Sequence, residues 1–273
     1  MIIRSNAHTH CNFCDGCDSA EDMIKAALKR GFSDLGFSCH GYTPFEIEYS
    51  LKDCRGEAYR AEIKRLKLLY AGRINISCGI EQDFYAPVIR SDYDYLIGSV
   101  HYIKDPRRDV YYGVDADQST LASCIDELFG GDAPAMVAHF YRLSVENVLK
   151  YQPDIIGHFD LVTKFNDSKL FFDQESPDYQ KVALQAIEQA AKSEAIFEIN
   201  TGAFAKGLTA VPYPAPFLLK SLQKLGGRVI INSDCHSTEQ LDSCFTDALY
   251  FAKECGFRRL SVLEGGMFIE KKI

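Results

Sequence analysis

The sequence lacks an excess of basic residues. Its 30 lysine and arginine residues are outnumbered by 38 aspartate and glutamate residues, and the formal net charge at pH 7 is −8. A chain with this balance has no broad positive surface that could neutralise the phosphates of a nucleic-acid backbone. We therefore do not expect a nucleic acid as a partner of this protein.

The N-terminal segment lacks a long apolar run. Residues 1–6 read MIIRSN and are polar from Arg4 onward, so they resemble neither the apolar core of a secretory signal nor a membrane-spanning helix. We expect a cytoplasmic protein without a membrane partner. Because the cytosol keeps thiols reduced, we expect the ten cysteines to form no disulfides.

The chain also lacks internal repeats, low-complexity tracts and linkers. Hydrophobic residues make up 47% and charged residues 25% of the sequence, the usual balance of a globular protein with a large core. A length of 273 residues is compatible with an α/β barrel that folds as one unit. We expect a single domain over residues 1–273.

Short apolar segments alternate with amphipathic ones along the chain. Brief, nearly continuous apolar runs are typical of strands that are covered on both faces in a parallel sheet. We expect strands at residues 2–7, 34–39, 74–80, 95–100, 155–157, 195–199 and 229–231, and a weaker one at 260–263. Helical spacing follows most of them, for example between the N-cap Ser19 and Gly31, and this alternation predicts an α/β fold. Two polar stretches, 104–118 and 166–178, are expected to form long loops.

Nine side chains of metal-binding types lie at or just after the ends of the expected strands. They are His8, His10, Asp15, His40, Glu81, His101, His158, Asp234 and His236. The carboxyl ends of parallel strands meet at one mouth of a barrel or sheet, so these side chains should converge there. Within each of the pairs His8/His10 and Asp234/His236, alternation along an extended chain places both side chains on one face. Imidazoles and carboxylates together suit zinc, iron or manganese.

The ordered motifs resemble those of the polymerase and histidinol phosphatase (PHP) superfamily. They are HTH at 8–10, His40, GIE at 79–81, GSVH at 98–101, GHFD at 157–160, EINTG at 198–202 and NSDCH at 232–236. Within the superfamily, the length, the HFDLVTKF segment and the EINTG segment are most similar to those of the monofunctional histidinol-phosphatases. The resemblance implies a distorted (β/α)7 TIM-like barrel, the PHP fold, with a metal site at the strand carboxyl ends.

The resemblance also implies two to three divalent metal ions, of zinc, iron or manganese. One ion would be held by His8, His10, Glu81 and Asp234, a second by Glu81, His101 and His158, and a third by Asp15, His40 and His236. Glu81 would then bridge two ions. Some members of the superfamily have histidine where this chain has Asp15, and aspartate is equally able to bind a metal ion.

The implied function is hydrolysis of L-histidinol phosphate to L-histidinol and phosphate in histidine biosynthesis, by attack of a metal-bridging hydroxide. A metal cluster can activate the water and neutralise the phosphoryl oxygens, so no serine or cysteine nucleophile is required. Two alternatives keep the metal site but change the substrate. One is a PHP-type phosphoesterase acting on another small phosphate ester or a nucleotide, and the other is an amidohydrolase-like metal hydrolase.

Further residues are expected to act on the substrate directly. Asp160, two residues after His158, could orient a water molecule or donate a proton to the leaving group. Lys164 is a second catalytic candidate and, with Lys206 and Asn200, a candidate for binding the phosphate. For the amine and imidazole of the substrate, the loop after His101 offers carboxylates and tyrosines. These are Asp105, Asp109, Tyr111, Tyr112 and Asp115.

Two conspicuous features are not assigned to the metal site. Cys11, Cys14 and Cys17 form a CxxCxxC pattern, which would suit an iron–sulfur module, but the fourth cysteine that such a site needs does not follow nearby. We treat the iron–sulfur module as a competing hypothesis from another class of protein. His139 does not follow an expected strand and is expected to be structural.

Overall fold

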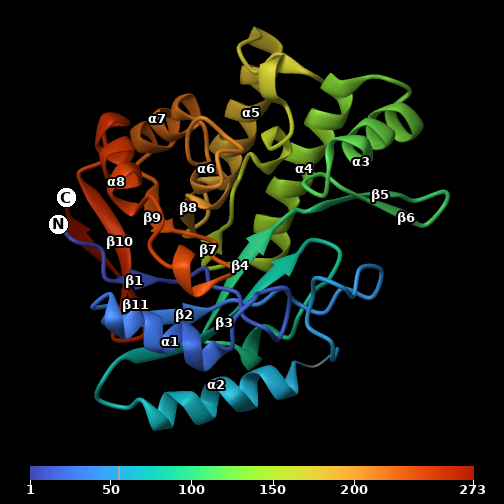
Figure 1. Ribbon diagram of the computed structural model, residues 1–273. Helices are drawn as coiled ribbons and strands as arrows, with labels where there is room; N and C mark the ends of the chain where they lie inside the picture. Colours follow the sequence, from blue (N-terminus) through green and yellow to red (C-terminus); the bar gives the residue numbers. More distant parts are fainter. Residues whose placement is uncertain (55) are drawn as a thin grey trace.

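The computed structural model contains one mostly parallel sheet, which curls into an incomplete barrel (Figure 1). It describes residues 1–54 and 56–273, with the side chain of Asp167 left out. In spatial order the strands are β1 (Ser5–Asn6), β2 (Asp34–Phe37), β3 (Asn75–Asp83), β4 (Tyr95–Ser99), β7 (Ile155–Ile156), β8 (Ile196–Asn200), β9 (Arg228–Asn232), β10 (Arg259–Glu264) and β11 (Met267–Lys272). Neighbouring strands are parallel except for β10 and β11, which pair antiparallel.

The segments that follow β1 and β9 meet at the carboxyl ends of the strands. Thr9 forms a parallel bridge with Cys235, and the amide of His10 donates to the carbonyl of Cys235 at 2.9 Å. This bridge brings the segments after β1 and β9 together, so that the seven strands β1–β4 and β7–β9 surround the interior of a distorted barrel. The distorted seven-stranded α/β barrel predicted from the sequence is therefore confirmed.

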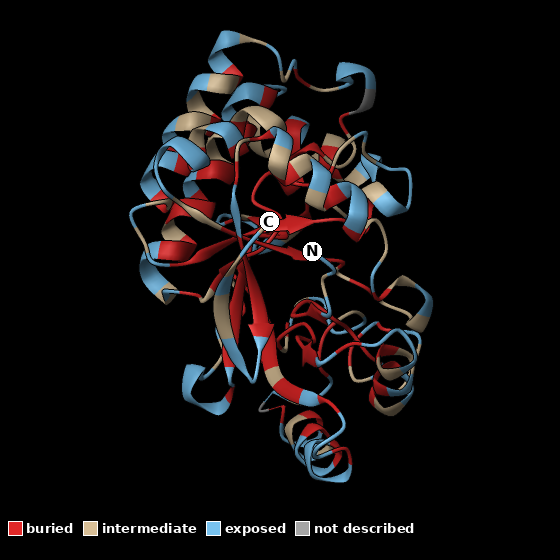
Figure 2. Cartoon of the chain, turned by 90° about the vertical axis from the view of Figure 1, so that its left-hand side faces the viewer, coloured by how far each residue is buried: buried red, intermediate tan, exposed pale blue. Residues whose placement is uncertain are grey.

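Helices cover the outside of the sheet (Figures 1 and 2). Figure 2 shows buried strands inside and exposed helix faces outside. The helices are α1 (Ala20–Lys29), α2 (Glu57–Leu69), α3 (Gln118–Ser123), α4 (Ala133–Tyr151), α5 (Pro177–Ala190), α6 (Gly202–Ala205), α7 (Pro216–Lys224) and α8 (Phe245–Glu254). Short 3₁₀ helices are η1 (Arg90–Asp92), η3 (Leu161–Thr163), η4 (Asp167–Lys169) and η5 (Thr238–Gln240), and η2 (Cys124–Leu128) is a π-helical turn.

Helix α1 shows how local sequence sets these boundaries. The hydroxyl of Ser19 accepts a hydrogen bond from the amide of Asp22 at 3.1 Å, which satisfies one of the free N–H groups of the first turn. Gly31 follows the helix with φ of +76°, a conformation that residues with a Cβ rarely adopt. The apolar residues at helical spacing, Met23, Ile24 and Ala27, face the core.

The prediction of a long loop at 104–118 is wrong for most of this segment. Residues of this segment form an antiparallel hairpin of β5 (Tyr102–Asp105) and β6 (Val110–Gly113), separate from the main sheet. The reason is the fully buried Asp105, which accepts from the amide of Arg107 at 2.9 Å and from Nε of Arg108 at 2.8 Å and so stabilises a tight turn. Polar residues that suggested a solvated loop are instead paired with one another.

Two other elements were not expected. Helix α4 contains His139, and Asp132 caps this helix by accepting from the amide of Ala135 at 2.9 Å. The final strand β11 is joined to β10 by Gly265 and Gly266, both with positive φ, in a two-residue hairpin turn. None of the helices formed by the described residues is long and apolar enough to cross a membrane.

Candidate active site

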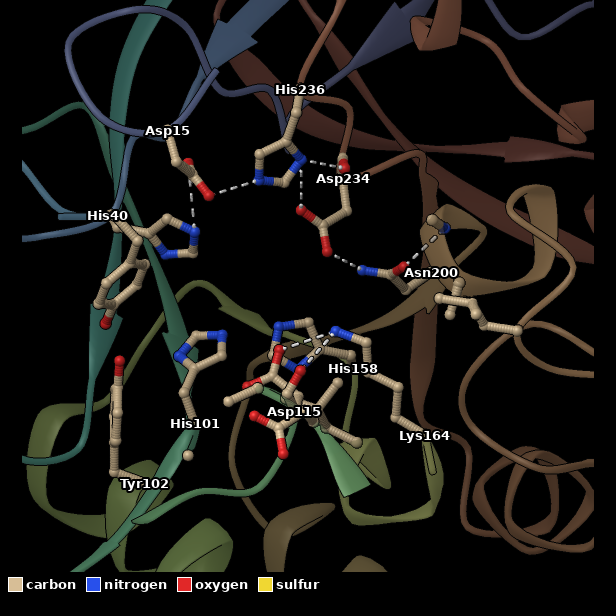
Figure 3. A pocket seen from close by; sticks show the side chains of 18 of the residues that line it. Asp15, His40, His101, Tyr102, Asp115, His158, Lys164, Asn200, Asp234 and His236 are labelled. Atoms are coloured by element: carbon tan, nitrogen blue, oxygen red, sulfur yellow. Dashed lines mark hydrogen bonds and ion pairs between the residues drawn. The ribbon is translucent and has the colours of Figure 1, made fainter. Parts of the chain in front are cut away.

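The barrel topology brings the nine predicted ligand side chains together at the carboxyl ends of the strands. A cavity of about 870 Å³ opens there (Figure 3). Six of the nine line it, namely Asp15, His40, His101, His158, Asp234 and His236. The other three, His8, His10 and Glu81, are buried at its floor, each no more than 1% exposed. The convergence predicted from the strand-end placement is therefore what the structure shows.

Glu81, near the end of β3, is the centre of the cluster. Its Oε2 lies 2.9 Å from Nδ1 of His40 and 3.2 Å from Nε2 of His8. On the other side, its Oε1 lies 3.0 Å from Nε2 of His158 and 3.4 Å from Nε2 of His101. A carboxylate with imidazoles around both oxygens has the geometry that a bridging ligand needs.

A second group of donors surrounds His10 on the side of Asp15. Nε2 of His236 lies 3.2 Å from Oδ2 of Asp15, and Nε2 of His40 lies 3.8 Å from Oδ1 of the same carboxylate. The rings of His10 and His236 stack at 4.2 Å. His10, Asp15, His40 and His236 thus offer four ligand atoms close enough for one ion. Compared with the set expected from the resemblance, this group adds His10.

The buried donors fit metal ions in their hydrogen bonding as well as in their spacing. Nε2 of His8, Nε2 of His10 and Oε2 of Glu81 are buried and lie close to other members of the cluster, but none of the three makes a hydrogen bond of good geometry with a described residue. Unsatisfied buried polar atoms are costly unless a ligand completes them. These three residues lie close enough together to bind one ion, so a cation there would satisfy all of them.

Glu198 on β8 contacts the cluster from behind, a role that was not predicted from the sequence. Its Oε1 accepts from Nδ1 of His8 at 2.7 Å and from the side-chain amide nitrogen Nδ2 of Asn232 at 3.0 Å. Its Oε2 accepts from the backbone N–H of His158 at 3.1 Å. A carboxylate on Nδ1 leaves the Nε2 lone pair of His8 directed at the cluster, as in many metal-binding histidines. The signal was present in the period of two that relates Glu198 to Asn200.

The buried carboxylates require compensating positive charge. Burial would raise the pKa of Glu81, but neighbouring imidazoles, first among them His8, hold this pKa well below its usual value. Burial would lower the pKa of His8, but the surrounding carboxylates, led by Glu198, raise it well above its usual value. Protonated imidazoles or metal cations can supply the positive charge that these carboxylates need.

The predicted phosphate-binding residues also reach the cavity, but only one of them is uncommitted. Lys206 is exposed and has no ion pair or side-chain hydrogen bond within the described part of the chain. Lys164 donates to the carbonyl and the carboxylate of Asp115 at 2.9 and 3.1 Å. The amide nitrogen of Asn200 donates to Glu198 and, at 3.1 Å, to Asp234. Asn200 is therefore placed to orient Asp234.

Asp160 is not among the described residues that line the cavity. It is 1% exposed, and its Oδ2 accepts from the backbone N–H of Ala215 at 2.8 Å. Burial raises the pKa of Asp160 to about 6. The period of two after His158 did not bring it to the same face, because η3 begins directly after Asp160 and the chain is no longer extended there. The structure thus ties this carboxylate to the loop before α7.

Of the five residues expected to recognise the amine and imidazole, only Tyr111 and Asp115 line the cavity. Asp105 is buried under the hairpin turn, and the exposed Asp109 pairs with Lys104 at 2.7 Å. The hydroxyl of Tyr112 donates to Glu127. The hairpin turns these three side chains away from the mouth, which a solvated loop would not have done.

The cysteines and His139 lie outside the candidate metal groups. Cys17 is exposed, whereas Cys11 and Cys14 are buried. Sγ of Cys11 lies 3.4 Å from Sγ of Cys39, and Sγ of Cys14 lies 3.5 Å from Nδ1 of His10. None of the possible metal-binding groups within the described residues includes a cysteine or His139. This geometry does not favour the iron–sulfur hypothesis.

A parallel α/β barrel with a buried histidine–carboxylate cluster at its strand ends belongs to the class of metal-binding barrel proteins. A family model, described as the PHP domain, matches residues 6–202. The chain is a member of the PHP domain family. The resemblance noted in the sequence is thereby confirmed.

Relatives of known name extend the match over nearly the whole chain. The probable histidinol-phosphatase of Schizosaccharomyces pombe is 27% identical over 288 residues, which cover 97% of this chain and 90% of that protein. That of Deinococcus radiodurans is 27% identical over 267 residues, with 94% and 95% covered. A solved structure of histidinol phosphate phosphatase from Lactococcus lactis subsp. lactis, complexed with zinc, L-histidinol and phosphate, matches with a TM-score of 0.70. It is 18% identical and covers 98% of this chain and all of that one, so the two share a fold.

Proposed function

We propose that this protein is a metal-dependent phosphomonoesterase that hydrolyses L-histidinol phosphate to L-histidinol and phosphate. The observation that carries the proposal is the carboxylate of Glu81, surrounded by five imidazoles at the floor of a cavity that also has lysines in its lining. Two relatives that match more than nine-tenths of this chain are named for this activity, and the Lactococcus structure binds both products.

The donor set suits two to three divalent ions of zinc, iron or manganese. The ligands would be His8, His10, Asp15, His40, Glu81, His101, His158, Asp234 and His236. When bound, such ions lower the pKa of a water molecule and neutralise charge on the phosphoryl oxygens. The two carboxylate oxygens of Glu81 face different histidines, which supports a bridging role for this residue.

The other residues of the chain position the donors and the substrate. Glu198 holds His8 through Nδ1, and Asn200 holds Asp234 through its amide nitrogen. The uncommitted ammonium group of Lys206 is available to a phosphoryl oxygen. Lys164 lines the cavity and is held by Asp115, so its ammonium group is already ordered when a phosphoryl group enters. Asp160 has no part in this scheme.

The test is a substrate screen with metal content measured on the same sample. We expect kcat/KM for L-histidinol phosphate to exceed that for p-nitrophenyl phosphate by about tenfold or more, which corresponds to about 1.4 kcal/mol of transition-state binding. A clear preference for a nucleotide or sugar phosphate would indicate another phosphoesterase. Release of amine from acylated amines without phosphatase activity would indicate the amidohydrolase-like alternative.

A further inference from the structure

The described part of the cavity wall contains five carboxylates, of which four are already engaged. Asp15 and Asp234 belong to the histidine cluster, and Asp115 holds Lys164. Asp117 caps α3 by accepting from the amide and hydroxyl of Thr120. The fifth, Glu46, is exposed and has no side-chain hydrogen bond or ion pair to any described residue. Glu46 is therefore the carboxylate that remains for a ligand.

The loop that carries Glu46 is held in place by aromatic packing. Phe45 stacks on Tyr111 of β6 with centroids 3.6 Å apart and an angle of 4°, and it meets the edge of Tyr102 at 5.0 Å. The amide of Glu46 itself donates to the carbonyl of Thr43 at 3.0 Å. Lys104 also lies over the ring of Tyr111, 4.8 Å from its centroid. Tyr111 thus holds this loop in place, and its own ring is contacted by both Phe45 and Lys104.

Glu46 lies on an aromatic side of the cavity. Glu46 lines the cavity together with Tyr102, and the ring of Tyr102 lies 5.0 Å from that of Phe45, the residue directly before Glu46. Tyr49, three residues after Glu46, also lines the cavity and contacts His40 at 4.6 Å between centroids. A carboxylate next to tyrosine rings is a suitable environment for an organic cation with a flat ring.

The opposite side of the cavity has the reverse charge. In Figure 3, Tyr102 and His40 lie on one side, and Lys164 and Asn200 lie on the other. The residues after β7 and β8 contribute Lys164 and Lys206, whereas those after β2 and β4 contribute Glu46 and Tyr102. The cavity is therefore polarised, with cations for an anionic group at one end and an acidic, aromatic subsite at the other.

We propose that Glu46 is a specificity-determining residue that binds the ammonium group of the substrate while the phosphate lies toward the lysines. The inference rests on the proposed function, because L-histidinol phosphate carries an ammonium group and an imidazole at the end opposite to its phosphate. The acidic residues of the hairpin, predicted from the sequence to bind this ammonium group, are engaged elsewhere. In their place, the proposal assigns this role to a residue of the loop after β2. Glu46 selects among phosphate esters and takes no part in breaking the P–O bond.

The experiment compares Glu46→Gln with Glu48→Gln, a change of the same kind at an exposed position of the same loop that does not line the cavity. Each protein is assayed on L-histidinol phosphate and on imidazolylpropyl phosphate, which lacks the ammonium group. We expect the ratio of the two kcat/KM values to fall about tenfold in Glu46→Gln, as loss of a charged hydrogen bond predicts, and to stay at the wild-type value in Glu48→Gln.

Wild-type behaviour separates the two hypotheses. If the wild type prefers L-histidinol phosphate and Glu46→Gln retains the full preference, the inference is overturned and the proposed function stands. If the wild type does not prefer L-histidinol phosphate over p-nitrophenyl phosphate, the proposed function fails and the inference fails with it. Circular dichroism spectra and melting temperatures of both variants establish that any change in the ratio comes from a folded protein.

Discussion

Lys164 and Asp115 link two segments across the cavity. The ammonium group donates to both the carbonyl and the carboxylate of Asp115, at 2.9 and 3.1 Å. Lys164 follows η3, whereas Asp115 lies between β6 and α3, so the pair connects the hairpin to the segment after β7. The carboxylate of Asp115 thus fixes Lys164 at the mouth of the site. The effects expected for Lys164→Met and for Asp115→Asn follow from this arrangement.

Replacing the lysine should weaken catalysis more than replacing its partner. We expect Lys164→Met to lower kcat/KM for the phosphate ester by about tenfold to a hundredfold, since one positioned cation on the phosphoryl group is lost. Asp115→Asn should cost only a few-fold, because the backbone acceptor of Lys164 remains. Lys169→Met, at an exposed lysine paired with Asp173 and Glu175, is the matched control. A Lys164→Met enzyme within twofold of wild type would contradict the assignment.

Glu81 should determine the occupancy of more than one metal ion. We expect Glu81→Ala to lose more than one metal equivalent per chain, because the carboxylate faces two different sets of histidines. His139→Ala should lose none, because His139 lies on α4 outside the cluster. Elemental analysis of purified proteins measures both. Equal metal content in wild type and Glu81→Ala would rule out the bridging role.

Glu198 should affect metal affinity without being a ligand. Glu198→Gln keeps the size of the side chain but removes the charge that accepts from Nδ1 of His8. We expect the affinity for the metal to fall by about tenfold to a hundredfold, as for other residues that orient a ligand histidine. Competition with a chromogenic chelator measures the affinity, and the exposed Glu194→Gln on the same segment is the control. Unchanged affinity in Glu198→Gln would show that His8 needs no such support.

Asp105 should make stability depend on pH. Its hydrogen bond from Arg108, together with the amide of Arg107, lowers the pKa of Asp105 from 3.8 to about 2. A carboxyl with a depressed pKa in the folded state stabilises the protein above the pKa of the unfolded chain, and this contribution is lost as the pH falls toward the folded pKa. Asp105→Asn should therefore lower the urea midpoint at pH 7, and the difference from wild type should shrink between pH 4 and pH 2. A constant difference over this range would mean that the charge of Asp105 is not the cause.

The metal cluster was predictable because its geometry follows from local rules. Side chains two residues apart on an extended chain share a face, and this relation holds for His8 and His10. The same rule failed at Asp160, where the chain enters a 3₁₀ turn directly after the residue. The convergence of ligands from different strands requires only that the strands are parallel, because the carboxyl ends of parallel strands meet at one mouth of the barrel. The alternation of apolar and amphipathic segments indicates such a parallel sheet.

The substrate side of the site was harder to predict because it depends on contacts between distant segments. Glu46 can be recognised only after Asp115 is seen to hold Lys164 and Asp117 to cap α3. Glu198 likewise acquires its role from His8, 190 residues earlier in the chain. The charged residues around Asp105 suggested solvent exposure, but mutual ion pairing let them form a hairpin. Composition does not distinguish these two outcomes.

The bridge between Thr9 and Cys235 has a consequence for the order of events during folding. His8 and His10 leave the ribosome more than 220 residues before Asp234 and His236, and the bridge is where the two pairs meet. The nascent chain cannot assemble the complete donor set until His236 has been synthesised and the segments after β1 and β9 have joined. Metal capture is then a late event that reports on completion of the barrel. Because an ion held by both edges binds only the closed form, it would slow their separation and raise the melting temperature with metal concentration.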